Sequence, residues 1–187
     1  MLLPPPQLRD EDKKLAELIL YISSKCANDI YFGATKLNKI LYFSDFLAYG
    51  NWGRSITGAE YQNLPNGPAP RHLKPVRDVL ELRKELAVQP VRFSSGKVQH
   101  RTIPLREPDL SLFSGQDIAL VDEIIKILSD MDAQGASALS HRMVGWKMTT
   151  AGETIPYQTI FLSNEPLSEA EIKRGREIAK SLGMLAA

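Results

Sequence analysis

The sequence contains a single cysteine, Cys26, among its 187 residues. One thiol cannot form a disulfide within the chain, and scarce cysteine is typical of proteins from a reducing compartment. Long hydrophobic runs are also missing, since none approaches the roughly 20 apolar residues that a membrane-spanning helix requires. The apolar start MLLPPPQL is interrupted by three prolines, unlike a signal segment. We therefore expect a cytoplasmic protein without a membrane span.

Residue patterns that carry catalysis are absent as well. The three histidines, His72, His100 and His141, are far apart and none has the spacing of a zinc motif such as HExxH. The sequence has no GxSxG elbow, no Walker-type loop and no GxGxxG motif. Cys26 falls on the apolar stripe of a predicted helix, where a buried, inert thiol is commoner than a nucleophile. The sequence predicts no catalytic residue, no metal site and no cofactor.

Helical periodicity is what the chain does contain. Apolar residues recur at helical spacing near residues 10–26, 34–50, 73–86, 114–131 and 168–183. The segment 34–50 is apolar most of the way round, which is typical of a central helix. We expect Pro90 to stop the third helix.

Capping signals mark the starts of the last two long helices. Ser114 with Asp117, and Ser168 with Glu171, have the spacing of capping boxes. Leu167 and Ile172 are placed as a hydrophobic staple at the second box, and Gly183 is placed as the left-handed residue that ends that helix.

The periodicity changes between the third and fourth helices. Residues 91–93 and 98–103 have β-type composition around Ser94-Ser95-Gly96, which predicts a short hairpin. Residues 135–148 indicate a short helix and turn, and 154–162 an extended piece. The predicted fold is mainly α with a small β-hairpin (α+β), as a single compact helical domain over 10–183. Residues 1–9 are expected to be a disordered tail and 184–187 a free C-terminal tail.

Basic residues concentrate in one segment although the formal net charge of the chain is only +1. A helix followed by a hairpin that carries Arg92, Lys97 and Arg101 could track phosphates as a winged helix does. A solvated helix face with a charged sheet edge explains the same residues. DNA binding is therefore an alternative function, through those three side chains.

Two blocks of the sequence resemble the Panacea domain, also called the SocA-like antitoxin domain. The first is KLNKILYFSDFLAYGNWGRSITGAEYQNLPNGPAP, and the second comprises SALSHRMVGWKM and IPYQTIFLS. The matching residues are Lys36, Leu37, Lys39, Ile40, Leu41, Tyr42, Phe43, Gly53, Ile56, Thr57, Gly58, Tyr61, Gly67, Pro68, Pro70, Ser140, His141, Gly145, Trp146, Ile155, Pro156 and Tyr157. The resemblance spans roughly residues 10–165. Asn66 and Ala69 depart from it, where an aromatic residue and valine are common.

The resemblance implies an antitoxin, which neutralises a co-encoded protein toxin by direct contact and without enzymatic activity. The partners implied are the cognate toxin and, through protein turnover, a cytoplasmic energy-dependent protease. The C-terminal residues Leu185, Ala186 and Ala187 are similar to the end of a degradation tag, although a chance helix-forming composition explains them equally. The sequence carries no prediction of oligomeric state.

Site residues fall into two groups. Gly58, Gly67 and Pro68 are expected to fix turns, and His141 and Trp146 to pack the distal short helix onto the core. Partner contacts are expected from the 52–72 loop and the exposed face of the preceding helix, because tyrosine, tryptophan and asparagine on a rigid loop suit binding. The residues concerned are Tyr42, Asp45, Trp52, Tyr61, Asn63 and Asn66. Ordinary loop and core-rim packing remains the alternative for them.

Overall fold

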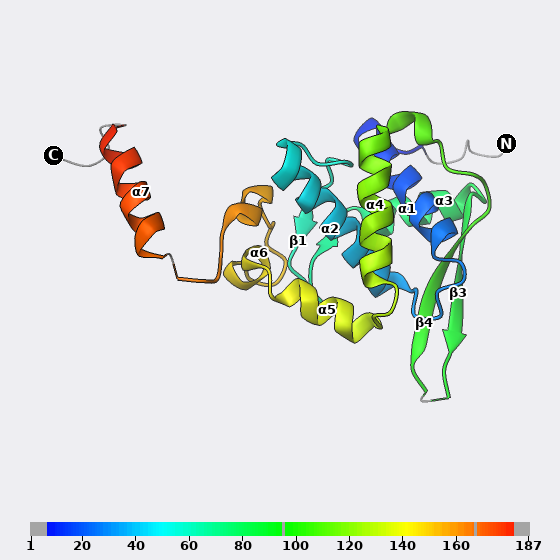
Figure 1. The fold of residues 1–187 in the computed structure, drawn as a ribbon. Helices are drawn as coiled ribbons and strands as arrows, with labels where there is room; N and C mark the ends of the chain where they lie inside the picture. The colour runs from blue at the N-terminus through cyan, green and yellow to red at the C-terminus, as the bar shows by residue number, and fades with distance from the viewer. Residues whose placement is uncertain (1–6, 95, 167, 182–187) are drawn as a thin grey trace.

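The computed structural model describes residues 7–94, 96–166 and 168–181. The fold is mostly helical with two small antiparallel two-stranded sheets, which confirms the predicted class (Figure 1). Its helices are α1 (Lys13–Lys25), α2 (Ala34–Trp52), α3 (Leu73–Leu82), α4 (Gly115–Leu128), α5 (Ala133–His141), α6 (Val144–Met148) and α7 (Glu169–Ser181). Its strands are β1 (Tyr61–Gln62), β2 (Ala69–Pro70), β3 (Leu86–Arg92) and β4 (Val98–Pro104). Three 3-10 helices, Asp10–Asp12, Leu110–Leu112 and Tyr157–Phe161, complete the order.

Helix α2 is central, as its apolar circumference predicts. It packs against α1, α4 and α5, against β2 and β4, and against the 3-10 helix Tyr157–Phe161. Leu37, Ile40 and Leu41 are fully buried within it. The helix ends at Trp52 and is followed by Gly53, whose φ of 71° is the left-handed conformation that favours glycine after a helix.

The hairpin of β3 and β4 projects beyond the helices (Figure 1). Its register pairs Leu86 with Pro104 and Arg92 with Val98. The expectation that the third helix continues to Pro90 is wrong. Helix α3 ends at Leu82 because Lys84 takes a φ of 58°, and Leu86 then enters the sheet instead.

Residues 154–162, expected to be extended, instead contain the 3-10 helix Tyr157–Phe161. The two expected capping boxes are confirmed. Asp117 N–H donates to Ser114 Oγ at 3.2 Å and Glu171 N–H donates to Ser168 Oγ at 3.3 Å, while each acidic side chain accepts from the backbone of its serine.

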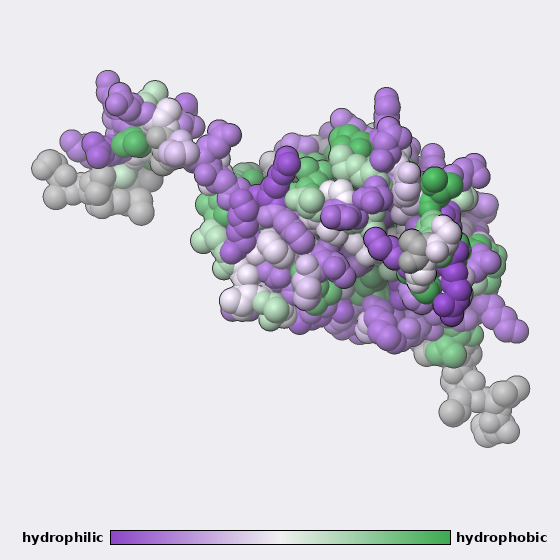
Figure 2. Space-filling model, turned by 90° about the horizontal axis from the view of Figure 1, so that it is seen from below, coloured by the Kyte–Doolittle hydropathy of each residue, from purple (hydrophilic) through white to green (hydrophobic). Residues whose placement is uncertain are grey.

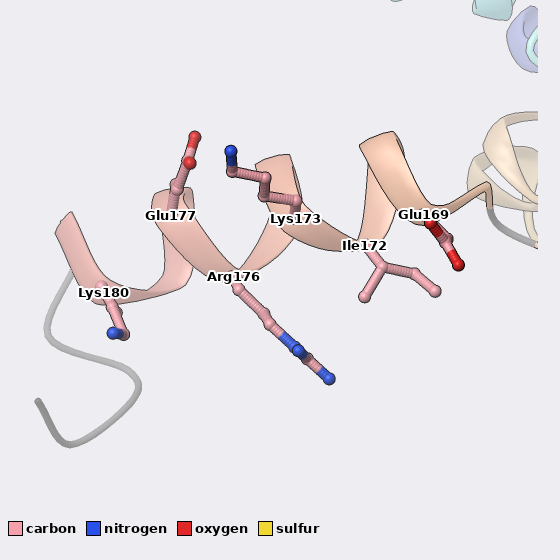
Figure 3. Close-up of a pocket in the computed structure, with 6 residues that line it drawn as sticks. All are labelled: Glu169, Ile172, Lys173, Arg176, Glu177 and Lys180. Atoms are coloured by element: carbon pink, nitrogen blue, oxygen red, sulfur yellow. The ribbon is translucent and has the colours of Figure 1, made fainter.

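Helix α7 stands clear of the other helices, and none of its described residues is buried (Figure 1). Figure 3 shows charged side chains such as Lys173 and Arg176 arranged around this one helix, with Ile172 among them. The predicted staple residue Leu167, the terminal Gly183 and the tails at 1–6 and 184–187 lie outside the described residues. Within the described ranges, no helix is both long and apolar enough to cross a bilayer.

Candidate partner-binding surface

The turn at residues 56–58 is held against α2 by one carboxylate. Asp45 Oδ1 accepts hydrogen bonds from the backbone N–H groups of Ile56 and Thr57, each at 2.8 Å. Its Oδ2 accepts from the Thr57 hydroxyl and from the Tyr61 hydroxyl. Burial raises the pKa of the Asp45 carboxyl, and these hydrogen bonds oppose that rise. Gly58, with φ of 76°, completes the turn in the left-handed conformation expected of it.

The tyrosines near this carboxylate belong to the core. Tyr61 is 1 % exposed, and its ring packs edge-on against Tyr42 and Phe46. Tyr42 and Asp45 are fully buried on α2. The expectation that Tyr42, Asp45 and Tyr61 face a partner is therefore wrong, because their side chains are enclosed in the core and contact one another there.

Asn63 joins the loop to the distal block. Its Nδ2 donates to the carbonyls of Trp146 and Thr149, each at 2.8 Å, and only 6 % of the residue is exposed. In return Trp146 Nε1 donates to the Leu64 carbonyl at 3.1 Å. His141 stacks on Trp146 with ring centroids 3.9 Å apart, which agrees with the packing role expected of both. The expectation that Asn63 is held out for a partner is wrong, since its amide satisfies buried carbonyls.

Two lysines of α2 that match the Panacea motif, and to which the sequence assigned no individual role, are also buried. Lys36 forms an ion pair with Asp29 at 2.6 Å. Lys39 Nζ donates to the Pro68 carbonyl at 2.9 Å, and burial lowers the pKa of its amine to about 7. Gly67, at φ of 92°, lies so close that a Cβ there would be 2.6 Å from Lys39 Nζ. Lys39 thus fixes the backbone at Gly67 and Pro68. The presence of two lysines on a largely apolar helix was the sequence feature that could have predicted their burial.

The buried contacts above join residues from α2 to α6 into one unit. The model of the family described as antitoxin SocA-like, Panacea domain, matches residues 37–147 of this chain. The chain belongs to this family. No curated protein and no solved structure matches it. Panacea motif residues such as Lys39, Tyr61 and Trp146 make hydrogen bonds that hold the fold together.

Two residues of the 52–72 loop that are predicted to contact a partner have side chains that are at least partly exposed. Trp52 is half-buried at the end of α2, with the Arg54 guanidinium 5.6 Å from its ring centroid. Arg54 in turn pairs with Asp117 at 3.0 Å. The Asn66 side chain is exposed, while its backbone carbonyl accepts from Ser137 Oγ at 3.0 Å. Trp52 and Asn66 therefore remain available to a partner, in contrast to Tyr61 and Asn63.

The basic residues of the hairpin also fall into two groups, one bonded to the rest of the fold and one exposed. Arg101 donates to the carbonyls of Asp29 at 2.7 Å and Ala27 at 2.9 Å, in the segment that follows α1. These hydrogen bonds give Arg101 a structural role, which disfavours its predicted contact with nucleic acid. Arg92 and Lys97 are exposed near the hairpin tip.

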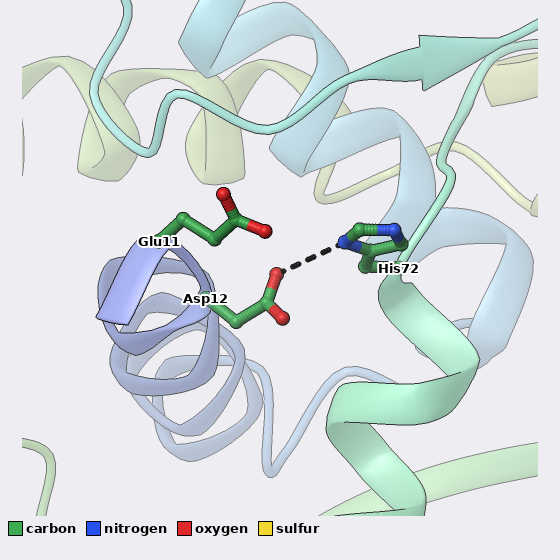
Figure 4. A group of neighbouring side chains, drawn as sticks. All are labelled: Glu11, Asp12 and His72. Carbon is green, nitrogen blue, oxygen red and sulfur yellow. Dashed lines mark hydrogen bonds and ion pairs between the residues drawn. The ribbon is translucent and has the colours of Figure 1, made fainter. Parts of the chain in front are cut away.

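Within the described part of the chain, one group of side chains is close enough to share a metal ion. Glu11, Asp12 and His72 have ligand atoms within 4.8 Å of one another (Figure 4). The Arg9 guanidinium already forms ion pairs with Glu11 at 2.5 Å and Asp12 at 2.6 Å, and His72 Nδ1 lies 3.2 Å from Asp12 Oδ1. We interpret the cluster as the polar contact that holds the start of α1 against α3.

Proposed function

We propose that this chain is an antitoxin that neutralises a co-encoded protein toxin by binding it directly. The observation that carries the proposal is the match to the SocA-like antitoxin family over residues 37–147. A stoichiometric binder blocks its target sterically or by changing its conformation, so no bond has to be made or broken.

The state of the buried polar groups supports binding in preference to catalysis. Asp45 is enclosed and saturated by four hydrogen bonds, and Lys36 is paired with Asp29. Cys26 is 2 % exposed and burial raises the pKa of its thiol to about 12, so it is a poor nucleophile. These groups hold the fold and are inaccessible to a substrate.

DNA binding remains the alternative proposal, and it now rests on Arg92 and Lys97 alone. A gel shift on the upstream region that weakens in the variant with both residues changed to alanine would support it. Binding that is absent, or insensitive to salt, would remove it.

Coexpression tests the proposed function. The product of the adjacent reading frame is expressed from an inducible promoter, with and without this chain, and growth is followed. We expect that product to stop growth alone and this chain to restore growth and to copurify with the product. A chain that is folded and abundant but neither protects the cells nor copurifies contradicts the proposal.

A further inference from the structure

One polar cluster joins two segments that are 60 residues apart in the sequence. Glu11 and Asp12 belong to the 3-10 helix that precedes α1, and His72 is the residue immediately before α3. Their ligand atoms, one from each residue, lie within 4.8 Å of one another. Figure 4 shows the two carboxylates and the imidazole pointing toward one another. The fold therefore brings together one nitrogen ligand and two oxygen ligands.

The spacing of two of these ligand atoms fits a tetrahedral metal ion. His72 Nδ1 lies 3.2 Å from Asp12 Oδ1. Two ligands of a tetrahedral zinc ion, each about 2.0–2.1 Å from the metal, are about 3.3–3.4 Å from each other. The Glu11 side chain is 67 % exposed and so has the freedom to move the third ligand into place. Water would take the fourth position, because these residues supply three ligands.

The ligand types favour a zinc-like ion over magnesium or calcium. Imidazole nitrogen suits ions such as Zn²⁺, whereas Mg²⁺ and Ca²⁺ take oxygen ligands and usually at least six of them. The two carboxylates balance the charge of a divalent ion. Asp12 is also held in position, since its side chain is only 11 % exposed and contacts both Arg9 and His72.

Arg9 is the cation that competes for these ligands. Its guanidinium pairs with Glu11 at 2.5 Å and with Asp12 at 2.6 Å. Its Nη2 lies 3.4 Å from His72 Nε2, and because a guanidinium can only donate, this contact leaves the imidazole proton on Nδ1. A metal ion on Nδ1 requires the opposite tautomer, so the Arg9 guanidinium has to move away from His72 before the ion binds.

The movement of Arg9 costs little stability. Its side chain is 49 % exposed, and solvent screens ion pairs at such positions. Arg9 Nε now donates to Asp12 Oδ2, and it can keep this bond because the ion would use Oδ1. The ion therefore replaces the hydrogen bond between Asp12 and His72 and one exposed ion pair with Glu11.

We propose that Glu11, Asp12 and His72 form a zinc-binding site, in which the ion ties the start of α1 to the start of α3. The ligands are one carboxylate oxygen of Glu11, Oδ1 of Asp12 and Nδ1 of His72. His72 is also the last residue of the 52–72 loop, so the ion fixes one end of that loop against α1. The site goes beyond the proposed function, which does not depend on it.

Three substitutions separate the ligands from the competing cation. His72→Ala removes the nitrogen ligand, and Glu11→Ala removes an oxygen ligand that belongs to an exposed side chain. Arg9→Ala removes the competitor. His100→Ala is the matched control, because His100 is an exposed histidine on β4, in the hairpin that points toward the viewer in Figure 2.

Titration calorimetry with zinc chloride measures binding to the full-length chain, and thermal unfolding in zinc or in EDTA measures its effect on stability. We expect one zinc ion per chain and a higher unfolding temperature in zinc, because a ligand that binds the folded state stabilises it. His72→Ala and Glu11→Ala should each weaken binding at least about tenfold, while His100→Ala should bind as the wild type does. Arg9→Ala should bind zinc at least about twofold more tightly.

The unfolding temperature in EDTA shows whether each variant folds, and Glu11→Ala tests the ligand set if His72→Ala does not. Absence of saturable binding by the wild-type chain at zinc concentrations up to about 1 mM would refute the site. Equal losses in His72→Ala and His100→Ala would refute it as well, since the ion would then bind surface histidines in general. Weaker binding by Arg9→Ala would contradict the position assigned to the ion.

Discussion

The Tyr61 hydroxyl donates a hydrogen bond of 2.7 Å to Asp45 Oδ2 inside the core, where Tyr61 is 1 % exposed and Asp45 is fully buried. This bond ties the loop after α2 to the middle of that helix. It also changes what a mutation at Tyr61 tests, because a truncation to alanine would open a cavity and remove a donor from a buried carboxylate.

Tyr61→Phe isolates the hydroxyl. We expect it to lower the free energy of unfolding by about 1–3 kcal/mol, since Asp45 Oδ2 stays buried and loses a hydrogen-bond donor. Urea unfolding monitored by circular dichroism measures this change. Tyr31→Phe, at a residue that is 42 % exposed, serves as the control and should be nearly neutral. Equal stability of Tyr61→Phe and the wild type would refute the role of Asp45 as the anchor of the loop.

Gly67 and Gly58 form a matched pair, since both have positive φ, of 92° and 76°. Gly58→Ala should cost about 1–2 kcal/mol from backbone strain alone, because among the described residues no atom lies within 4 Å of its new Cβ. Gly67→Ala should cost at least about 1 kcal/mol more, since its Cβ would clash with Lys39 and with Ser140. Thermal or urea unfolding measures the stability lost in each variant. Equal losses at the two positions would contradict the close approach of Gly67 to Lys39 and Ser140.

Lys39 should give the protein a measurable pH dependence. Its pKa is lowered by burial from the ordinary 10.5 to about 7, so between these values the unfolded chain binds a proton that the folded chain does not. Stability therefore rises with pH above 7, by up to about 1.4 kcal/mol per pH unit.

The measurement is urea unfolding at intervals from pH 7 to pH 9, below the range in which tyrosines ionise. The rise should be present in the wild type and absent in Lys39→Met. Parallel pH profiles of the two proteins would show that Lys39 keeps its charge when folded.

Arg101 and Arg92 separate a structural role from a surface role on the hairpin. Arg101→Ala should destabilise the protein by about 1–3 kcal/mol, because it leaves the carbonyls after α1 without their donor. Arg92→Ala should change stability by less than about 0.5 kcal/mol, as surface substitutions usually do. Chemical unfolding of both variants tests this, and a neutral Arg101→Ala would return that residue to the candidates for nucleic-acid contact.

The predicted degradation tag concerns residues outside those that the structure describes. Changing Ala186 and Ala187 to aspartate should lengthen the half-life of the protein in cells, because tag-reading proteases favour a small apolar end. A translation shut-off followed by immunoblotting measures the half-life, with Glu177→Asp, on α7, as a control. An unchanged half-life would remove the proposed role of Leu185, Ala186 and Ala187.

The sequence was sufficient for the features that depend on local pattern. The central position of α2 follows from its apolar circumference, and the capping boxes at Ser114 and Ser168 follow from spacing. The predicted end of α3 is wrong because Leu86 continues the helical spacing of Val79, while the reversal at Lys84 has no glycine to mark it.

The roles of the site residues were harder to predict, because the same residue types occur in binding loops and in buried polar contacts. Tyrosine and asparagine suit a binding loop, but they also satisfy buried carboxylates and carbonyls, and Tyr61 and Asn63 do the latter.

Direct contact with the toxin is the central claim, and calorimetric titration of the purified chain into the purified product of the adjacent reading frame tests it most directly. We predict saturable binding at a fixed stoichiometry. Growth protection in cells without detectable binding between the purified proteins would contradict neutralisation by contact.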